Sequence, residues 1–181
     1  MPRHSDPQLE GRILSTADRL FHRGGEKALT MRAVARAAGT TTPTLYQRFR
    51  NREEILRVLV QRSQQRLVEE IRPSRSLGEL CQRVLAYCLA NPHDYELLSS
   101  DLIAKLNEPR PTVQFVLEKT AQWFGGLPED HYPLILALWS LLQGAIVLLQ
   151  TLPEREARVT RSSLTTAVRV LIRDRQAFAA R

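Results

Sequence analysis

The sequence predicts an all-α protein of about nine helices, and three features lead to this expectation. Apolar residues recur every three or four positions along most of the chain, which is the spacing of one helix face. Residues that typically begin or end helices separate these segments from one another. Runs that alternate apolar and polar residues, as half-buried strands do, are almost absent.

The first helix is expected to begin at Asp6-Pro7, because aspartate caps helices and proline is tolerated in the first helical turn. Gly24-Gly25 is expected to end this helix. Between these two points the residues suited to one buried face are Leu9, Ile13, Ala17, Leu20 and Phe21.

A short helix and a glycine turn are predicted to follow, within residues 30–52. Thr30 can cap the helix, and Val34 supplies an apolar residue for its inner face. Gly39 can adopt the left-handed conformation that reverses the chain. The segment therefore reads as the first half of a helix-turn-helix unit.

The second helix of this unit is expected to start near Thr41 or Thr42, with Pro43 in the turn where backbone N–H groups lack intrahelical partners. Leu45 and Phe49 are four residues apart and are expected to face inward. The side chains left for the outer face are Thr42, Thr44, Tyr46, Gln47 and Arg48. Hydroxyl, aromatic and basic groups on one short helix suit insertion into the major groove of DNA.

The rest of the chain is predicted to be helical as well. Asn51 can cap a fourth helix, with Glu54 as the partner in a capping box, and this helix should end before Pro73. Ser76 and Glu79 repeat the same capping pattern. The later helices are expected at about 76–91, 94–106, 112–124, 130–152 and 154–178.

Charge is concentrated in the N-terminal third of the chain. The net charge is +7, and residues 1–62 hold 12 lysines and arginines against 6 acidic residues. Residues 63–181 are nearly neutral, with 14 basic and 13 acidic residues. A basic head of this kind favours nucleic acid as the partner. A membrane surface is the weaker alternative, because the basic residues do not lie opposite exposed Trp or Leu on one amphipathic face.

The sequence gives no sign of a metal site, a cofactor or an enzyme. Cys81 and Cys88 lie seven residues apart with no histidine at ligand spacing, so two free thiols are expected. Common catalytic patterns are absent, including Gly-x-Ser-x-Gly, a phosphate-binding glycine loop and His-Glu-x-x-His. The N-terminus lacks an apolar leader, which favours a cytoplasmic location. The apolar run Pro133–Leu152 is interpreted as a buried helix rather than a membrane span.

A family pattern runs from Ile13 to Leu56. It comprises Ile13-Leu14, Ala17, Leu20-Phe21, Gly24-Gly25, Leu29-Thr30-Met31, Val34-Ala35, Ala38-Gly39, Pro43-Thr44-Leu45-Tyr46, Phe49, Asn51-Arg52-Glu53 and Ile55-Leu56. This pattern resembles the DNA-binding head of the tetracycline-repressor (TetR) family of bacterial regulators. Thr40 and Arg52 depart from it, standing where an aliphatic residue and a lysine are usual. The resemblance implies a helix-turn-helix DNA-binding domain at 1–52 and a helical regulatory and dimerisation domain at 53–181.

Phosphate contacts are expected from three side chains. The hydroxyl of Tyr46 can donate to a phosphate, although a half-buried tyrosine that closes the core is the alternative. Arg48 and Arg52 can clamp phosphates, and an ordinary solvated basic face is the alternative for both.

Base contacts are expected from the start of the second helix. A threonine hydroxyl suits a base edge, the Pro43 ring suits a thymine methyl, and Gln47 can pair with adenine. The resemblance adds Arg32, at a position that some family members use for DNA contact. The complete set of DNA-binding candidates is Thr30, Arg32, Thr41, Thr42, Pro43, Thr44, Tyr46, Gln47, Arg48 and Arg52.

One head offers little surface for selective binding, so a homodimer on a near-palindromic double-stranded operator is expected. The interface candidates form a stripe on the last helix, although both final helices could instead fill the monomer core: Leu164, Ala167, Val168, Leu171 and Ile172. Aromatic residues that could line an effector pocket, or alternatively pack as ordinary core, are Tyr87, Tyr95, Phe115, Trp123, Phe124 and Trp139, together with Gln143.

These features predict a sequence-specific, non-enzymatic transcriptional regulator. A repressor that is released from its operator by a small, mostly apolar or aromatic effector is the leading hypothesis, by analogy with the resembled family. The alternative is a DNA-binding protein of the same fold that acts constitutively or through a protein partner.

Overall fold

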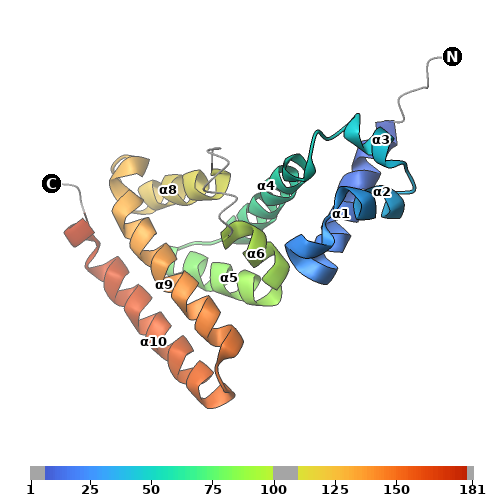
Figure 1. The fold of residues 1–181 in the computed structure, drawn as a ribbon. Helices are drawn as coiled ribbons and strands as arrows, with labels where there is room; N and C mark the ends of the chain where they lie inside the picture. Colours follow the sequence, from blue (N-terminus) through green and yellow to red (C-terminus); the bar gives the residue numbers. More distant parts are fainter. Residues whose placement is uncertain (1–6, 100–109, 179–181) are drawn as a thin grey trace. The chain divides into compact units, whose positions relative to one another are not determined.

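The computed structural model describes residues 7–99 and 110–178, and every regular element within them is helical (Figure 1). The predicted all-α class is therefore confirmed. The α-helices are α1 (Pro7–Ala28), α2 (Met31–Ala37), α3 (Thr42–Tyr46), α4 (Arg52–Ile71), α5 (Leu77–Ala90), α6 (Pro92–Ser99), α8 (Pro111–Phe124), α9 (Tyr132–Thr151) and α10 (Glu154–Arg173). Two short 3₁₀ helices are η1 (Pro128–His131) and η2 (Arg175–Phe178).

The chain divides into two compact units. The first, called the head, contains the described residues among 1–63 and 93–108. The second, called the body, contains 64–92 and the described residues among 109–181. Compactness thus groups α6 with the head, whereas the sequence assigns only residues 1–52 to the DNA-binding domain.

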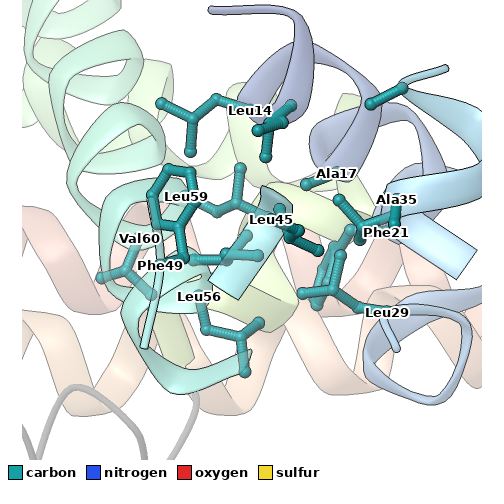
Figure 2. Close-up of a cluster of buried hydrophobic side chains, with 14 of the residues drawn as sticks. Leu14, Ala17, Phe21, Leu29, Ala35, Leu45, Phe49, Leu56, Leu59 and Val60 are labelled. Carbon is teal, nitrogen blue, oxygen red and sulfur yellow. The ribbon is translucent and has the colours of Figure 1, made fainter. Parts of the chain in front are cut away.

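The head encloses its own apolar core, to which α1, α2, α3, α4 and α6 all contribute. Figure 2 shows part of this core, including Leu14, Phe21 and Leu45. Phe21, Leu29 and Leu45 are almost completely buried at its centre. Leu45 and Phe49 face inward as predicted. Leu45 lies on α3 and Phe49 follows its C-terminal end, and together they anchor this five-residue helix to the core. Burial of several large side chains stabilises an element too short to be helical alone.

The turn between α2 and α3 has the predicted geometry. Gly39 adopts a φ of 67°, in the left-handed region. The side chain of Thr30 accepts from the Ala33 N–H at 3.2 Å at the start of α2. The side chain of Thr41 accepts from the Thr44 N–H at 3.3 Å at the start of α3. Thr30 is therefore the cap expected from sequence, and α3 begins where it was expected, with Thr41 as its cap.

We expect Gly39→Ala to destabilise the head by about 1–2 kcal/mol, because a Cβ disfavours the left-handed conformation. Gly11→Ala is a matched control, since Gly11 lies within α1 with open space around it. The control should be stabilising by up to about 1 kcal/mol. Denaturant unfolding of both variants measures the difference, and equal effects would contradict the assigned role of Gly39.

Polar contacts attach α6 to α1 and α4 within the head. Asp94 is buried, and its Oδ1 accepts from the Ser63 hydroxyl at 3.1 Å. The Nε2 of His22 lies 3.8 Å from the same oxygen, while its Nδ1 donates to the Asp18 carbonyl at 2.8 Å. Leu97 adds the apolar part of this attachment by entering the head core.

Gly24 and Gly25 interrupt the first helix as expected, because both have non-helical backbone, and a short second helical segment completes α1 up to Ala28. Two later helix ends differ from the sequence expectations. The last predicted helix is interrupted at Asp174, whose carboxylate accepts from Arg173, so α10 and η2 are separate. The predicted helix at 94–106 is α6 as far as Ser99, and its remainder lies outside the described residues.

The body is a helical layer in which α9 packs against α10 and α5, and α8 packs against η1 and α9 (Figure 1). The two capping boxes were predicted correctly in part. Asn51 Oδ1 and Ser76 Oγ each accept the N–H three residues on, at 2.9 and 3.2 Å. The reciprocal carboxylates of Glu54 and Glu79 reach one residue further back than expected, to the N–H groups of Arg50 and Arg75.

Helix α9 was expected to be buried, but it is buried on one side only. Within the described part of the chain, the segment Pro128–Thr151 is the one helix long and apolar enough to cross a membrane, and 28% of its apolar window is buried. Length and composition alone are weak evidence for a span. An apolar helix face that is exposed in the monomer is typical of an interaction surface.

Candidate functional site

Helix α3 presents a compact polar surface. Its first turn exposes Thr41 and Pro43, and its end exposes Tyr46 and Gln47. Tyr46 is 51% exposed, so its ring lies on the outer face rather than closing the core. Thr42 and Thr44 are half-buried, and the hydroxyls of Thr41 and Thr44 lie 2.8 Å apart. The outer face thus offers hydroxyl, amide and aromatic groups on a rigid support, as base and phosphate contacts require.

The basic side chains near α3 differ in their availability. Arg32 is exposed in the first turn of α2, whereas Arg48 is half-buried. Arg52 forms an ion pair with Glu26, at the C-terminal turn of α1. A phosphate contact by Arg52 would therefore have to compete with this carboxylate.

Two further exposed arginines, Arg36 on α2 and Arg50 before α4, were missed by the sequence reasoning. The concentration of basic residues over 1–62 was the available signal, but it could not distinguish these two from the other arginines.

The body contains a cavity of about 550 Å³ between the start of α5, the end of α8, α9 and α10. Its walls are mostly apolar and include Leu77, Cys81, Leu85, Trp123, Phe124, Leu142, Leu164, Val168 and Ile172. Its polar residues are Arg75, Ser76, Gln82, Thr165 and Arg169, and Gly78 completes the lining. The size and the ratio of apolar to polar groups match those of small-molecule sites in proteins.

The predicted pocket residues are not all brought together. Trp123 and Phe124 line the cavity, whereas the other five are not among its lining residues. Tyr95 belongs to the head, and Phe115 lies under the guanidinium of Arg72, with 5.6 Å between Cζ and the ring centroid. Gln143 lies on α9, and its buried Oε1 has no hydrogen-bond partner in the described structure.

The predicted interface stripe on α10 also faces inward in part. Leu164 and Val168 are buried and line the cavity together with Ile172, while Ala167 and Leu171 are partly covered. One apolar face of a helix packs either inside its own monomer or against a partner subunit. Three residues of this stripe face the cavity of the monomer, so they are not available for contact with a partner.

An uncharged surface is nevertheless exposed on the other side of the same two helices. Helix α9 carries no charged residue. Its exposed residues include Leu136, Ser140, Gly144, Val147, Leu148 and Thr151, which we call the α9 stripe. Helix α10 exposes Val159, Ser163, Thr166 and Val170 between its arginines. These residues could not be recognised from sequence, because the same helices are apolar on several sides.

Residues 13–59, which form most of the head core and the whole of α2 and α3, match the family model for bacterial regulatory proteins of the tetR family. Over these residues the chain is similar to the tetR family of bacterial regulatory proteins. The resemblance inferred from residues 13–56 is thereby confirmed. The match supports the predicted role as a DNA-binding transcriptional regulator.

Solved structures of bacterial regulators share the fold along nearly the whole chain. TetR from Acinetobacter baumannii AYE has a TM-score of 0.62 at 17% identity, covering 95% of this chain and 98% of that chain. A TetR-family transcriptional regulator from Streptomyces coelicolor gives 0.55 at 20%, covering 91% and 97%. The fatty acid degradation regulator FadR from Bacillus halodurans gives 0.56 at 19%, covering 93% and 94%. A comparison with curated protein sequences finds no match.

Both cysteines of the body, Cys81 and Cys88, are buried. Burial raises the pKa of the Cys81 thiol to about 12, so this thiol on the cavity wall is neutral at physiological pH. Among the described residues, no group of three or more His, Cys, Asp or Glu side chains is placed to hold a metal ion.

Proposed function

We propose that the protein is a cytoplasmic repressor that binds a near-palindromic operator as a homodimer and is released by a small apolar effector. The observation that carries this proposal is the exposed polar face of α3 on a basic head. Thr42, Pro43, Thr44 and Gln47 would read bases, while Tyr46 and the arginines would hold phosphates. The proposal requires no cofactor.

The α9 stripe supports the homodimer. Small residues, Ser140 and Gly144, lie between the larger Leu136 and Leu148, so a second helix could approach closely. Two copies of α9 and α10 would form a four-helix bundle that buries this stripe. Such a dimer carries two heads, and two-fold symmetry matches a near-palindromic operator. Repression then needs only that the dimer covers a promoter.

The cavity supports an effector. Its walls are apolar and it is large enough for a drug-sized compound. The rival function is a DNA-binding protein without an effector, for which the cavity would be a packing defect. A compound that raises the melting temperature of the protein would separate the two, because a ligand stabilises the state that binds it.

Selection of bound sequences from a random duplex library tests the central proposal. An enriched near-palindrome would support a dimeric, sequence-specific regulator and would provide an operator for later assays. Binding that is sensitive to salt but shows no enriched sequence would contradict sequence-specific repression.

We expect Tyr46→Phe to weaken binding to operator and to non-operator DNA alike, by about three- to tenfold, through loss of one hydrogen bond to a phosphate. The ring is retained, so the head should remain folded. Tyr132→Phe is the matched control, because Tyr132 is 48% exposed but lies at the start of α9 in the body. Titration of both variants against labelled duplexes measures the effect, and identical affinities would remove Tyr46 from the interface.

A further inference from the structure

We propose that the body cavity binds a carboxylate attached to an apolar chain or ring, with Arg75 and Arg169 holding the carboxylate at the rim. This inference deepens the effector proposal and rests on it, but the binding step itself requires no DNA. It differs from the aromatic pocket expected from sequence in its location, its lining and the charge of its ligand.

The apolar wall fixes the body of the ligand. Leucine, valine and isoleucine side chains from α5, α9 and α10 face two aromatic rings at the end of α8. Trp123 and Phe124 supply those rings, and Cys81 adds a neutral thiol. Arg175 covers Phe124, with its Cζ 4.4 Å from the ring centroid, so the aromatic wall is held in place by η2. A ligand body of hydrocarbon character would bury apolar area against all of these groups.

The two arginines at the rim of the cavity, Arg75 and Arg169, indicate the charge of the ligand. Arg75 precedes α5 and Arg169 lies on α10, and no aspartate or glutamate is among the lining residues. Neither guanidinium has an ion-pair partner within the described parts of the chain. Two arginines beside an apolar cavity favour an anion, and a planar carboxylate suits guanidinium donors.

Glu79, the acidic residue nearest to Arg75 in the sequence, already accepts hydrogen bonds from other groups. The carboxylate of Glu79 accepts the Arg75 N–H at 2.9 Å and the Arg83 Nε–H at 3.1 Å. These hydrogen bonds, the one from the Arg75 backbone above all, hold the pKa of Glu79 below its usual value. Glu79 therefore remains bound to its own helix cap and to Arg83. It also attracts the charge of Arg75, as the smallest of the causes that lower its pKa, but it accepts no hydrogen bond from that guanidinium, whose N–H donors remain for the ligand.

Helix α10 connects the cavity to the proposed dimer surface. Leu164, Val168 and Ile172 form its cavity side, while Val159 and Val170 are exposed on its other side. A ligand that fills the cavity presses on a helix that would also pack against the partner subunit. The arrangement of the two subunits would then depend on occupancy, which is the coupling that release from an operator requires.

Direct binding to the full-length protein tests the ligand class. The probes are decanoate against 1-decanol, and 2-naphthoate against 2-naphthalenemethanol, all below their aggregation concentrations. Trp139→Phe leaves Trp123 as the single tryptophan, so its fluorescence reports the cavity wall. We expect at least one carboxylate to bind about tenfold more tightly than its alcohol, and the pair that does so identifies a chain or a ring as the ligand body.

Variants locate the binding site. Arg75→Gln and Arg169→Gln should each remove most of the carboxylate preference while leaving the alcohol affinity unchanged. Arg158→Gln is the matched control, because Arg158 is exposed on α10 and does not line the cavity. Gly78→Leu should weaken all the probes, since a Cβ at this position would already lie 3.9 Å from Ile172 Cδ1 and a longer side chain would enter the cavity.

The outcomes separate this inference from the proposed function. Equal affinities for carboxylates and alcohols, or a carboxylate preference that survives both rim substitutions, would overturn the ligand class. Binding that is unaffected by Gly78→Leu would overturn the site. The DNA selection is independent of all these results, so an operator could be found even if the cavity proposal fails. A carboxylate that binds the cavity but does not release the operator would support the site and contradict the effector role.

Discussion

A protein with both Val147→Asp and Leu148→Asp is expected to be a folded monomer that has lost operator binding. These side chains are 51% and 46% exposed on α9, so the monomer tolerates aspartate at both positions. In the proposed dimer the same carboxylates would be buried without partners, and each unpaired buried charge opposes association by several kcal/mol. Loss of the second head should reduce operator affinity by more than about 100-fold.

Sedimentation and operator titration measure these two effects. Leu127→Asp is the control, because Leu127 is an exposed leucine that lies outside α9 and α10. A double variant that still sediments as a dimer would show that the α9 stripe is not the interface. Charge at Val168 would be a poorer test, since Val168 is buried beside the cavity and its aspartate would damage the body whether or not the protein dimerises.

Phe21→Ala is expected to destabilise the head by about 3–5 kcal/mol, which is a large fraction of the stability of a small domain. Phe21 is 2% exposed and lies among Leu29, Ala35 and Leu45 in the core that supports α3 (Figure 2). Its removal leaves a cavity beneath the DNA-reading helix. DNA binding should therefore fail at a lower temperature than in the unmodified protein.

Thermal unfolding followed by DNA titration at several temperatures tests this expectation. Leu20→Ala is the neighbouring control, because Leu20 is only partly buried against the same core. Its effect should be smaller by at least about 1 kcal/mol. Equal losses from the two substitutions would mean that the position of Phe21 in the core does not decide the stability of the head.

The head could be predicted closely because its determinants are local. A threonine cap, a residue that tolerates positive φ and an apolar pair four residues apart are visible in adjacent positions of the chain. Thr30, Gly39 and the pair Leu45 and Phe49 accordingly have the hydrogen bond, the conformation and the burial expected for them. The ion pair between Arg52 and Glu26 was not predictable in this way, because the two residues come from different helices.

The body could be predicted only as a set of helices. Its cavity depends on which sides of α5, α8, α9 and α10 meet, and Trp123 and Phe124 were found by residue type alone. Arg75 and Arg169, which decide the charge of the proposed ligand, lie 94 positions apart in the sequence. No spacing rule connects residues at that distance.

The sequence by itself determined the helical class, several helix caps, the basic head and the resemblance of that head to the TetR family, since each depends on residues that are neighbours along the chain. Only the tertiary structure decided which side of an apolar helix is used inside the monomer. On α10, Leu164 and Val168 turn to the cavity and leave Val159 and Val170 exposed. The physical reason is that the hydrophobic effect is non-directional and depends only on how much apolar area is buried. A helix that is apolar on several sides therefore takes its orientation from the elements that pack against it.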